Sequence, residues 1–469
     1  MIGLKKQMVK MKLSSHQHVM DKFHQLKKVE QLDAAAMKAT QDAQLTKLLE
    51  HAYAHTGYYR KLFEKHGVMA GGKIRLDRFD RLPFLTKEIM RDEFEGLKSD
   101  DLASRSWYEN TSGGSTGFQA KFLQDNVYKD WAQANKVLFD EWSGRGIGDK
   151  QIRLWGSVRD LLVGKETWRT QAGRWLRNEI WLNAYNMTAD RISEYVNTIN
   201  RFKPVHILSY VESIYELSRY IRQKGIRVHS PRGIMTTAGV LTPEMREMIE
   251  STFNTRVFNR YGSREVGDIA CECDKHEGLH ISEYTHYVEI VRDDGSLAEP
   301  GEIGHIAVTQ LTNYAMPLIR YRIGDMGAMS EHRCSCGRPQ RMLREVTGRE
   351  SDTFYTPGGG KVHGTYFTQI FYPEQWIKQY QVVQEQIDEI EVKIVCEEGA
   401  VALNSRKDRL DAVKSSIKRA MGDTCRITFT FTDHIPATAS GKYRYTISKV
   451  DPSKLAETGE DSREPVGIG

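Results

Sequence analysis

Apolar residues recur at three- and four-residue intervals along the first part of the chain. From about Leu13 to Val68 this spacing continues with few glycine or proline residues to interrupt it. Apolar side chains at such intervals line one face of an α-helix. The pattern therefore predicts that residues 1–68 form a helical lead-in.

Beyond Pro83, short β-rich runs alternate with helical stretches. The predicted strands are 152–155, 206–208, 233–235 and 256–258, and helices are predicted at 191–202 and 214–223. This alternation favours an α/β architecture with a largely parallel sheet. From His280 to Met329 the pattern changes to strands and turns, with a hairpin-like segment at 291–296. We expect a large N-terminal domain with mixed sheets, completed by a β-rich subdomain.

A Gly/Pro segment from Pro357 to Gly360 marks a second change of pattern. It is followed by β-rich runs and one helix, at 381–384, 390–395, 409–421 and 426–431. These elements predict a small α+β C-terminal domain. The expected limits are 1–350 for the N-terminal domain and 351–450 for the C-terminal domain, and the polar segment 451–469 is expected to be a disordered tail.

Composition narrows the functional classes. The 469 residues are 39% hydrophobic and 28% charged, which is typical of a soluble protein with two or more domains. No apolar run reaches the roughly 20 residues needed to span a bilayer. Because the start of the chain also lacks the apolar region of a signal peptide, we expect a cytoplasmic protein.

Charge says little about macromolecular partners. A net charge of +5 is small for this length, and no array of basic and aromatic residues indicates nucleic-acid binding. The segment from Met1 to Leu13 carries four lysines. Such a segment could lie weakly on an anionic membrane surface as an amphipathic helix, but we favour the alternative of a solvated helix face.

The first segment with candidate chemistry is Asn110-Thr-Ser-Gly-Gly-Ser-Thr-Gly117. Its three glycines allow the backbone to approach a polyphosphate, and its hydroxyl and N–H groups can donate to phosphate oxygens. It lacks the Gly-Lys-Ser/Thr of the P-loop NTPases. A flexible surface turn would have a similar sequence.

Four further segments carry suitable side chains. In 259–265, Tyr261 can stack on a base and Glu265 can hold magnesium, although an ordinary turn would also fit. In 320–325, Asp325 follows an expected tight glycine turn and can accept ribose hydroxyl groups. The last two segments are 348–352 at the domain boundary and 436–442, where Lys442 can neutralise phosphate charge.

In this order the five segments resemble the motifs of the adenylate-forming enzyme superfamily, which includes acyl-CoA synthetases, peptide-synthetase adenylation domains and luciferases. The resemblance runs from Thr111 to Lys442. The phenylacetate–CoA ligase-like group is the most similar, in particular its branch associated with capsular-polysaccharide biosynthesis. That branch is indicated by the doubled glycine of 112–115, by 261–265, by Gly278-Leu-His280 and by Cys334-Ser-Cys-Gly-Arg338.

The resemblance implies a role for each matching residue. Lys442 is the catalytic residue, Glu265 the magnesium ligand, and Ser351 and Asp352 the hinge. The implied ATP- and AMP-binding residues are Thr111, Ser112, Gly113, Gly114, Ser115, Thr116, Gly117, Ala238, Gly239, Tyr261, Gly262, Ser263, Asp325 and Arg349. The implied walls of the acyl pocket are Trp155, Tyr210 and Ala238.

The implied reaction has two steps. A carboxylic acid, with an aromatic acid as one candidate, is activated by Mg·ATP as its acyl-adenylate with release of pyrophosphate. The acyl group then passes to an acceptor after the C-terminal domain has moved. The acceptor is CoA in the first hypothesis, and an amine or hydroxyl, such as that of a sugar for a surface polysaccharide, in the second. A non-catalytic nucleotide-binding regulator is a third hypothesis, and a homodimer is compatible with all three.

Two departures from the family pattern bear on this interpretation. Phe118-Gln119 stands where a proline commonly follows the phosphate loop, which should change the rigidity of the loop without removing a donor. A segment from Tyr355 to Lys361 is inserted where CoA-using relatives have a short loop. The insert leaves the choice between CoA and another acceptor open.

Four soft ligands form a Cys-x6-His plus Cys-x-Cys set: Cys273, His280, Cys334 and Cys336. This is the composition of a tetrahedral structural zinc site. The spacing is not that of a zinc finger, but phenylacetate–CoA ligase-like proteins resemble the chain at these positions. Cys271 would be a spare thiol and His276 a substitute ligand. Cys396 and Cys425 lie in apolar contexts typical of core residues.

Overall fold

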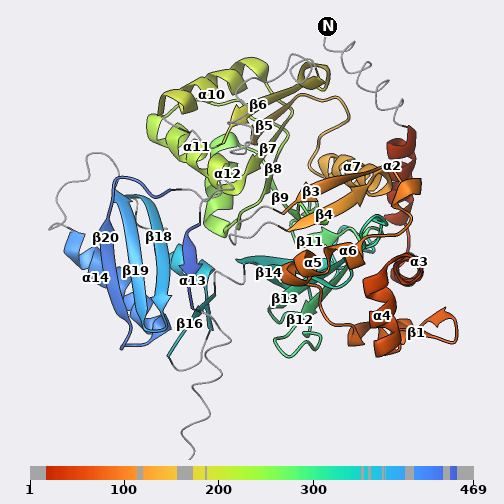
Figure 1. Ribbon diagram of the computed structural model, residues 1–469. Helices are drawn as coiled ribbons and strands as arrows, with labels where there is room; N and C mark the ends of the chain where they lie inside the picture. Colours follow the sequence, from red (N-terminus) through yellow and green to blue (C-terminus); the bar gives the residue numbers. More distant parts are fainter. Residues whose placement is uncertain are drawn as a thin grey trace, which may run out of the picture. The chain divides into compact units, whose positions relative to one another are not determined.

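The computed structural model describes residues 17–112, 120–155, 173–184, 187, 189–349, 353–357, 361–371, 374, 376–396, 406–436 and 444–450. The chain separates into two compact units, one extending to Val346 and the other beginning at Thr347 (Figure 1). The domain limits at 350 and 450 remain predictions. Ser351, Asp352 and the tail lie outside the described residues.

The predicted lead-in contains three helices, α2 (Gln17–Val29), α3 (Ala34–His55) and α4 (Gly57–His66). Asp33 and Thr56 cap the N-termini of α3 and α4, because their side chains accept hydrogen bonds from backbone N–H groups of the first turn. Gly67 ends α4 in the left-handed conformation, with φ of 68°. Helix α2 packs against α7 (Asn126–Trp142) through apolar side chains.

Several short elements join the lead-in to the main sheet. They are β1 (Met69–Ala70), β2 (Lys73–Ile74), η1 (Leu76–Arg81), α5 (Lys87–Asp92), α6 (Phe94–Leu97) and η2 (Leu102–Ser104). A two-stranded antiparallel hairpin follows, formed by β3 (Trp107–Thr111) and β4 (Lys121–Asp125).

Five parallel strands form one part of an 11-stranded sheet. They are β5 (Gln151–Trp155), β6 (Glu179–Asn183), β7 (His206–Tyr210), β8 (Gly233–Thr237) and β9 (Val257–Ser263). Helices α10 (Ala189–Phe202), α11 (Val211–Lys224) and α12 (Pro243–Phe253) lie beside these strands (Figure 1). Their apolar faces share one core with the strands. The predicted α/β architecture is confirmed, and the predicted strands agree with the observed ones.

The β-rich part of this unit continues the same sheet through β9. Its strands are β10 (Gly267–Glu272), β11 (Leu279–Ile281), β12 (His286–Val291), β13 (Gly304–Gln310), β14 (Tyr321–Met329) and β15 (Met342–Arg349). The prediction of a tight turn at Gly324 is wrong. Gly324 lies in a bulge within β14, where the pairing with β13 shifts between Arg322 and Met326. The bulge places Asp325 on the strand itself.

The second unit has a four-stranded sheet in the order β20-β19-β18-β21. Its elements are β16 (Thr353–Tyr355), β17 (Lys361–His363), α13 (Gly364–Phe371), β18 (Ile377–Gln386), β19 (Glu389–Cys396), α14 (Lys407–Met421), β20 (Arg426–Phe431) and β21 (Thr446–Ser448). Cys425 is buried in its core and Cys396 packs against that core. The inserted segment begins and ends on paired strands, because Tyr355 lies opposite Lys361.

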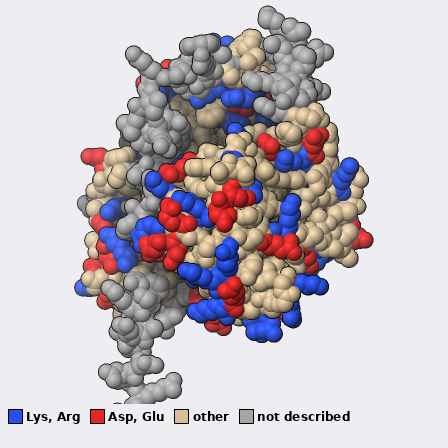
Figure 2. All heavy atoms as spheres, turned by 45° about the vertical axis from the view of Figure 1, so that its right-hand side comes forward, with Lys and Arg blue, Asp and Glu red and all other residues tan. Residues whose placement is uncertain are grey.

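The surface is mixed in charge. On the face drawn in Figure 2, lysine and arginine side chains are interspersed with aspartate and glutamate. Within the described ranges, no helix combines the length and apolar character needed to cross a bilayer.

Candidate active site and metal centre

Strands β3 and β4 form the stem of the predicted phosphate loop. Thr111 pairs with Lys121 at the end of the stem. Beyond it, the Ser112 N–H donates to the Ala120 carbonyl at 2.9 Å, and the Ala120 N–H donates to Ser112 Oγ at 2.9 Å. These bonds fix both ends of the loop. The other predicted phosphate ligands, Gly113, Gly114, Ser115, Thr116 and Gly117, lie outside the described residues.

Two of the predicted nucleotide ligands meet in the first unit. The Tyr261 hydroxyl, on β9, donates to Asp325 Oδ2 on the β14 bulge at 2.9 Å. Gly262 follows Tyr261 where a side chain would not fit, because a Cβ atom there would lie 2.5 Å from the Gly267 carbonyl oxygen. The close pairing of β9 and β10 therefore requires glycine. Ser263 ends β9 and its hydroxyl accepts from the Val266 N–H at 3.4 Å.

Glu265 lies in the turn between β9 and β10 and is 6% exposed. Its backbone carbonyl accepts a hydrogen bond from Gln124 on β4. Among the described residues none donates to its carboxylate. A carboxylate to which no described residue donates is a suitable oxygen ligand for magnesium. The donor set at this turn therefore fits the predicted metal.

The predicted walls of the acyl pocket meet at one edge of the parallel strands. Trp155 ends β5 and Tyr210 ends β7, and their ring centroids lie 4.4 Å apart at an interplanar angle of 34°. Ala238 and Gly239 follow the end of β8, which pairs with β7. Ala238 has a φ of 65°, a left-handed conformation uncommon for a residue with a side chain. Ligands of open α/β sheets bind at this edge, outside the carboxyl ends of the strands.

The remaining predicted site residues lie at or beyond the end of β15. Arg349 is the last residue of that strand. Ser351, Asp352 and the catalytic candidate Lys442 lie outside the described residues. Their roles stay predictions.

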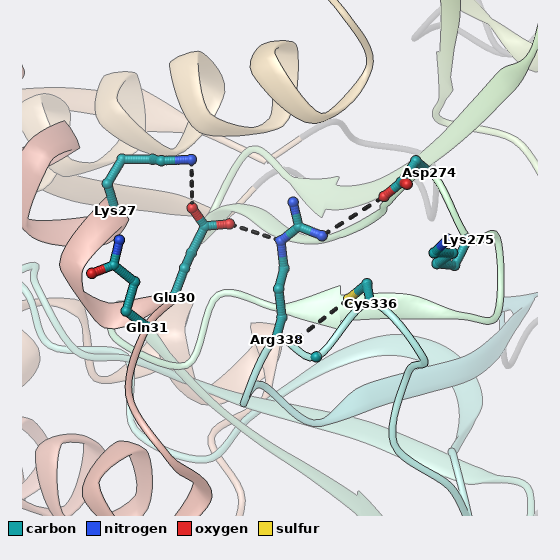
Figure 3. Close-up of a pocket in the computed structure, with 8 residues that line it drawn as sticks. Lys27, Glu30, Gln31, Asp274, Lys275, Cys336 and Arg338 are labelled. Carbon is teal, nitrogen blue, oxygen red and sulfur yellow. Dashed lines mark hydrogen bonds and ion pairs between the residues drawn. The ribbon is translucent and has the colours of Figure 1, made fainter.

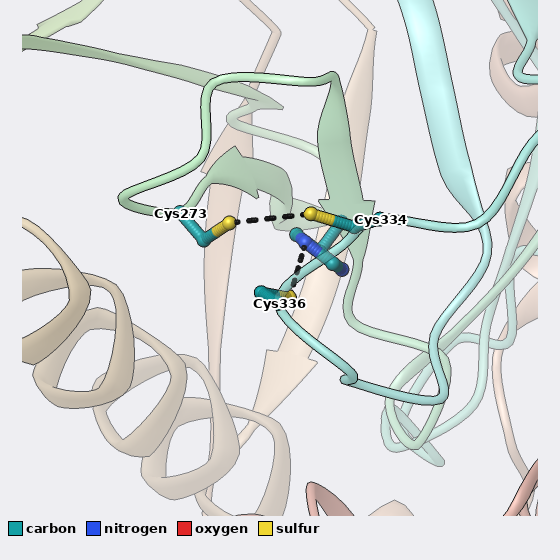
Figure 4. Close-up of side chains that lie close together, drawn as sticks. Cys273, Cys334 and Cys336 are labelled. Carbon is teal, nitrogen blue, oxygen red and sulfur yellow. Dashed lines mark hydrogen bonds between the residues drawn. The ribbon is translucent and has the colours of Figure 1, made fainter.

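The four predicted zinc ligands lie together. One ligand atom from each of Cys273, His280, Cys334 and Cys336 lies within 4.8 Å of the others. Figure 4 shows how the three cysteine side chains converge. Cys273 Sγ is 3.6 Å from Cys334 Sγ, and Cys336 Sγ is 3.5 Å from His280 Nε2. Burial, with a smaller contribution from Arg338, lowers the pKa of His280 to about 4. The imidazole is therefore neutral at pH 7 and can act as a ligand.

The surroundings of the cluster also fit a metal. The backbone N–H groups of Lys275 and Arg338 donate to Cys273 Sγ at 3.4 Å and Cys336 Sγ at 3.5 Å. Such donors stabilise sulfur in its charged form. His276 instead faces Glu272, with Nδ1 at 3.2 Å from its carboxylate, and Cys271 packs in a separate apolar cluster. Neither belongs to the set of four.

Arg338 connects the cluster to the helical lead-in (Figure 3). Its Nε donates to Glu30 Oε1 at 2.8 Å, and its guanidinium lies 4.7 Å from the centre of the Trp142 ring. Trp142 Nε1 also donates to Glu30 Oε1, and Lys27 forms an ion pair with the same carboxylate. Burial opposes ionisation of Glu30, but Lys27 and Arg338 outweigh this effect and lower the pKa of the carboxyl group. The cysteine loop is thereby fixed to α2.

A second group of potential metal ligands, His51, His55 and Asp101, does not form a convergent site. The two imidazole rings lie 4.7 Å apart at an interplanar angle of only 32°. His51 Nε2 lies 2.9 Å from the Tyr314 carbonyl oxygen and His55 Nδ1 lies 2.7 Å from Asp100 Oδ1, so a nitrogen of each ring already has a protein partner. Arg105 moreover donates to both Asp101 oxygens, at 2.8 and 2.6 Å.

Sequence reasoning missed Gln124, which contacts the Glu265 turn. It lies in the buried run Phe122–Asp125, where a polar amide needs hydrogen-bond partners. A glutamine within a run of buried strand residues could have indicated a position with a specific hydrogen-bonding role.

Comparisons with known proteins show what the chain is similar to. The family model described as the CapK C-terminal domain matches residues 354–449. Protein CapK of Staphylococcus aureus is 26% identical over 402 residues, covering 84% of this chain and 85% of that protein. The phenylacetate-coenzyme A ligase of Thermus thermophilus is 23% identical over 454 residues, covering 89% and 97%.

A solved structure shares the fold over most of its length. It is a 2-hydroxyisobutyryl-CoA ligase in the postadenylation state, in complex with 2-HIB-AMP. It superposes with a TM-score of 0.71 at 16% sequence identity, covering 92% of this chain and 93% of that one.

Proposed function

We propose that this homologue of CapK and of the phenylacetate–CoA ligases is an adenylate-forming, ATP-dependent acid ligase. In the proposed reaction a carboxylic acid becomes an acyl-adenylate, and the acyl group then passes to CoA. The single observation that carries the proposal is the meeting of Tyr261 and Asp325 at 2.9 Å. Sixty-four residues apart in sequence, they form one candidate nucleoside site.

In the first half-reaction a carboxylate oxygen of the acid attacks the α-phosphorus of ATP, and the bond to pyrophosphate breaks. Asp325 accepts hydrogen bonds from the ribose, and the Tyr261 ring stacks on the base. Residues 111–117 bind the phosphates by donation from backbone and hydroxyl groups. Glu265 would hold Mg²⁺, which neutralises phosphate charge when bound. Lys442 stabilises the charge on the reacting oxygens.

In the second half-reaction the CoA sulfur attacks the acyl carbonyl carbon, AMP leaves and the thiol proton is lost. The phenylacetate-coenzyme A ligase relatives favour this acceptor. The similarity to Protein CapK and the match of its C-terminal domain favour a second candidate. In that case an amine or hydroxyl of a sugar attacks the same carbon. Both routes share the first half-reaction.

We propose an aromatic acid as the substrate class. The Trp155 and Tyr210 rings pack on each other, with centroids 4.4 Å apart and a tilt of 34°, and offer an aromatic wall at the carboxyl ends of β5 and β7. Aromatic groups pack on such walls in offset or tilted arrangements. Because the co-substrates ATP and CoA are cytoplasmic metabolites, we also place the protein in the cytoplasm.

Pyrophosphate exchange tests the first half-reaction. Purified protein should exchange labelled pyrophosphate into ATP only when an acid from a panel of aromatic, hydroxy and amino acids is present. Release of AMP that depends on CoA should follow with the same acid. Exchange without a CoA effect would favour the sugar acceptor, and no exchange with any acid would favour a regulator that only binds nucleotide.

We further propose that Cys273, His280, Cys334 and Cys336 hold one structural Zn²⁺. Three thiolates and one imidazole fit tetrahedral zinc, and the set leaves no ligand position for substrate. The ion would join β10, β11 and the loop before β15. It would take no part in acyl transfer.

Changing Asp325 to Ala should weaken ATP binding about ten- to a hundred-fold. The change leaves two ribose hydroxyl groups without an acceptor, at a cost of about 1–3 kcal/mol. The apparent affinity for the acid should change little, because the acyl pocket is built from other strands. Calorimetry with Mg·ATP measures the first effect, and acid titration of exchange measures the second.

Tyr261→Phe is the matched control for this prediction. It removes the hydroxyl that donates to Asp325 but retains both the ring and the carboxylate. We expect a much smaller loss of ATP affinity than in Asp325→Ala. Unchanged ATP affinity in Asp325→Ala would show that the nucleotide binds elsewhere.

A further inference from the structure

Gln124 is a polar residue in a buried position. It lies in β4, and its side chain is 1% exposed. Its Nε2 donates to two backbone carbonyls, those of Arg264 and Glu265, each at 3.1 Å. The side-chain amide therefore uses both of its N–H groups on the turn that carries Glu265.

The other end of the same amide faces the phosphate-loop stem. Gln124 Oε1 accepts from Asn110 Nδ2 at 3.3 Å, and Asn110 Oδ1 accepts from the Thr111 N–H at 2.9 Å. A chain of three hydrogen-bonded steps thus runs from Thr111, at the start of the phosphate loop, to the Glu265 turn. A long contact from Arg264 Nη1 to the Thr111 carbonyl at 3.5 Å runs beside it.

We propose that Gln124 is a positioning residue that holds the β3–β4 stem of the phosphate loop against the turn that carries Glu265. The inference rests on the proposed function, because only a bound Mg·ATP would need both at once. Mg²⁺ demands nearly ideal octahedral geometry, so a small displacement of one ligand relative to the phosphates weakens binding. Gln124 itself contacts neither the ion nor the nucleotide in this assignment.

The chain contains a matched control for Gln124. Gln41, on α3, is also 1% exposed and also donates through Nε2 to two backbone carbonyls. One carbonyl belongs to Glu283, in the turn before β12, at 3.2 Å, and the other to His286, the first residue of β12, at 2.9 Å. Replacing either glutamine by methionine removes the same kind of bonds from the same unit. Of these two glutamines, only Gln124 joins the two parts of the candidate site.

The experiment compares Gln124→Met with Gln41→Met in the full chain. Both variants should unfold at a lower temperature than the parent. Only Gln124→Met should raise the Mg²⁺ concentration required for half-maximal pyrophosphate exchange, by about ten-fold. Loss of an outer-shell partner of a metal ligand typically weakens metal binding by about ten- to a hundred-fold, and we expect the lower end of that range. Calorimetry at varied Mg²⁺ should show the same shift in ATP binding. The affinity for the acid should be unchanged.

Several outcomes separate the alternatives. If both variants shift the Mg²⁺ dependence equally, or neither does, Gln124 has only a structural role and the inference is wrong. If Gln124→Met does not fold, Asn110→Ala replaces it; this change at a partly exposed position removes the middle step of the same hydrogen-bond chain and should produce the same shift. A parent without acid-dependent exchange would overturn the proposed function instead.

Discussion

Replacing Lys442 with alanine should slow formation of the acyl-adenylate about a hundred- to a thousand-fold, the usual loss for one preorganised electrostatic contact. The role of Lys442 is inferred from the motif it ends, since the residue lies outside the described part of the chain. An ammonium group there would neutralise charge on the reacting oxygens during attack on the α-phosphorus. Pyrophosphate exchange and single-turnover release of pyrophosphate measure this step.

The second half-reaction should be nearly unaffected by the same change. Consumption of a chemically supplied acyl-adenylate with the true acceptor involves no attack on phosphorus, so the Lys442→Ala rate should stay near that of the parent. Lys449→Ala is the matched control, because Lys449 lies seven positions further along and its amine pairs with Glu385 at the surface, at 2.7 Å. It should leave both steps unchanged. Equal damage to both half-reactions by Lys442→Ala would contradict a role confined to adenylate formation.

The parallel part of the sheet was predictable because its strands are short runs rich in β-branched, apolar and aromatic residues between helical stretches. Strand β5 was predicted at 152–155 and spans Gln151–Trp155, and β8 was predicted at 233–235 and spans Gly233–Thr237. Strands buried on both faces show this pattern without reference to tertiary structure. Strands β16 and β17 were missed because each has three residues, too few for a periodic signal.

The candidate site was predicted by motif order rather than by local geometry. The sequence placed Asp325 after a tight turn, whereas the structure has a bulge, because bulge formation depends on the pairing of β13 with β14. The contact between Arg338 and Glu30 joins residues 308 positions apart. Contacts at that separation follow from the packing of α2 against the main unit, which periodicity does not reveal.

Replacing Cys334 and Cys336 together with serine should remove the zinc and a large part of the stability of the first unit. The parent should contain about one zinc per chain by elemental analysis, and the double variant close to none. At free zinc a thousand times above the dissociation constant, binding to the folded state alone stabilises it by about 4 kcal/mol. The melting temperature of the parent should therefore fall when a strong chelator is added, and that of the variant should not respond.

Cys271→Ser provides the control for this prediction. Cys271 lies two positions from Cys273 and is fully buried, but it packs in the apolar cluster that includes Trp131 and Tyr284. The change can lower stability through the buried hydroxyl, yet it should leave the zinc content at about one per chain. Loss of stability and loss of zinc are thus separable. A metal-free parent whose double variant melts at the same temperature would show that the four side chains only pack together. In that case the contact between Arg338 and Glu30 would hold this loop against the end of α2 without an ion.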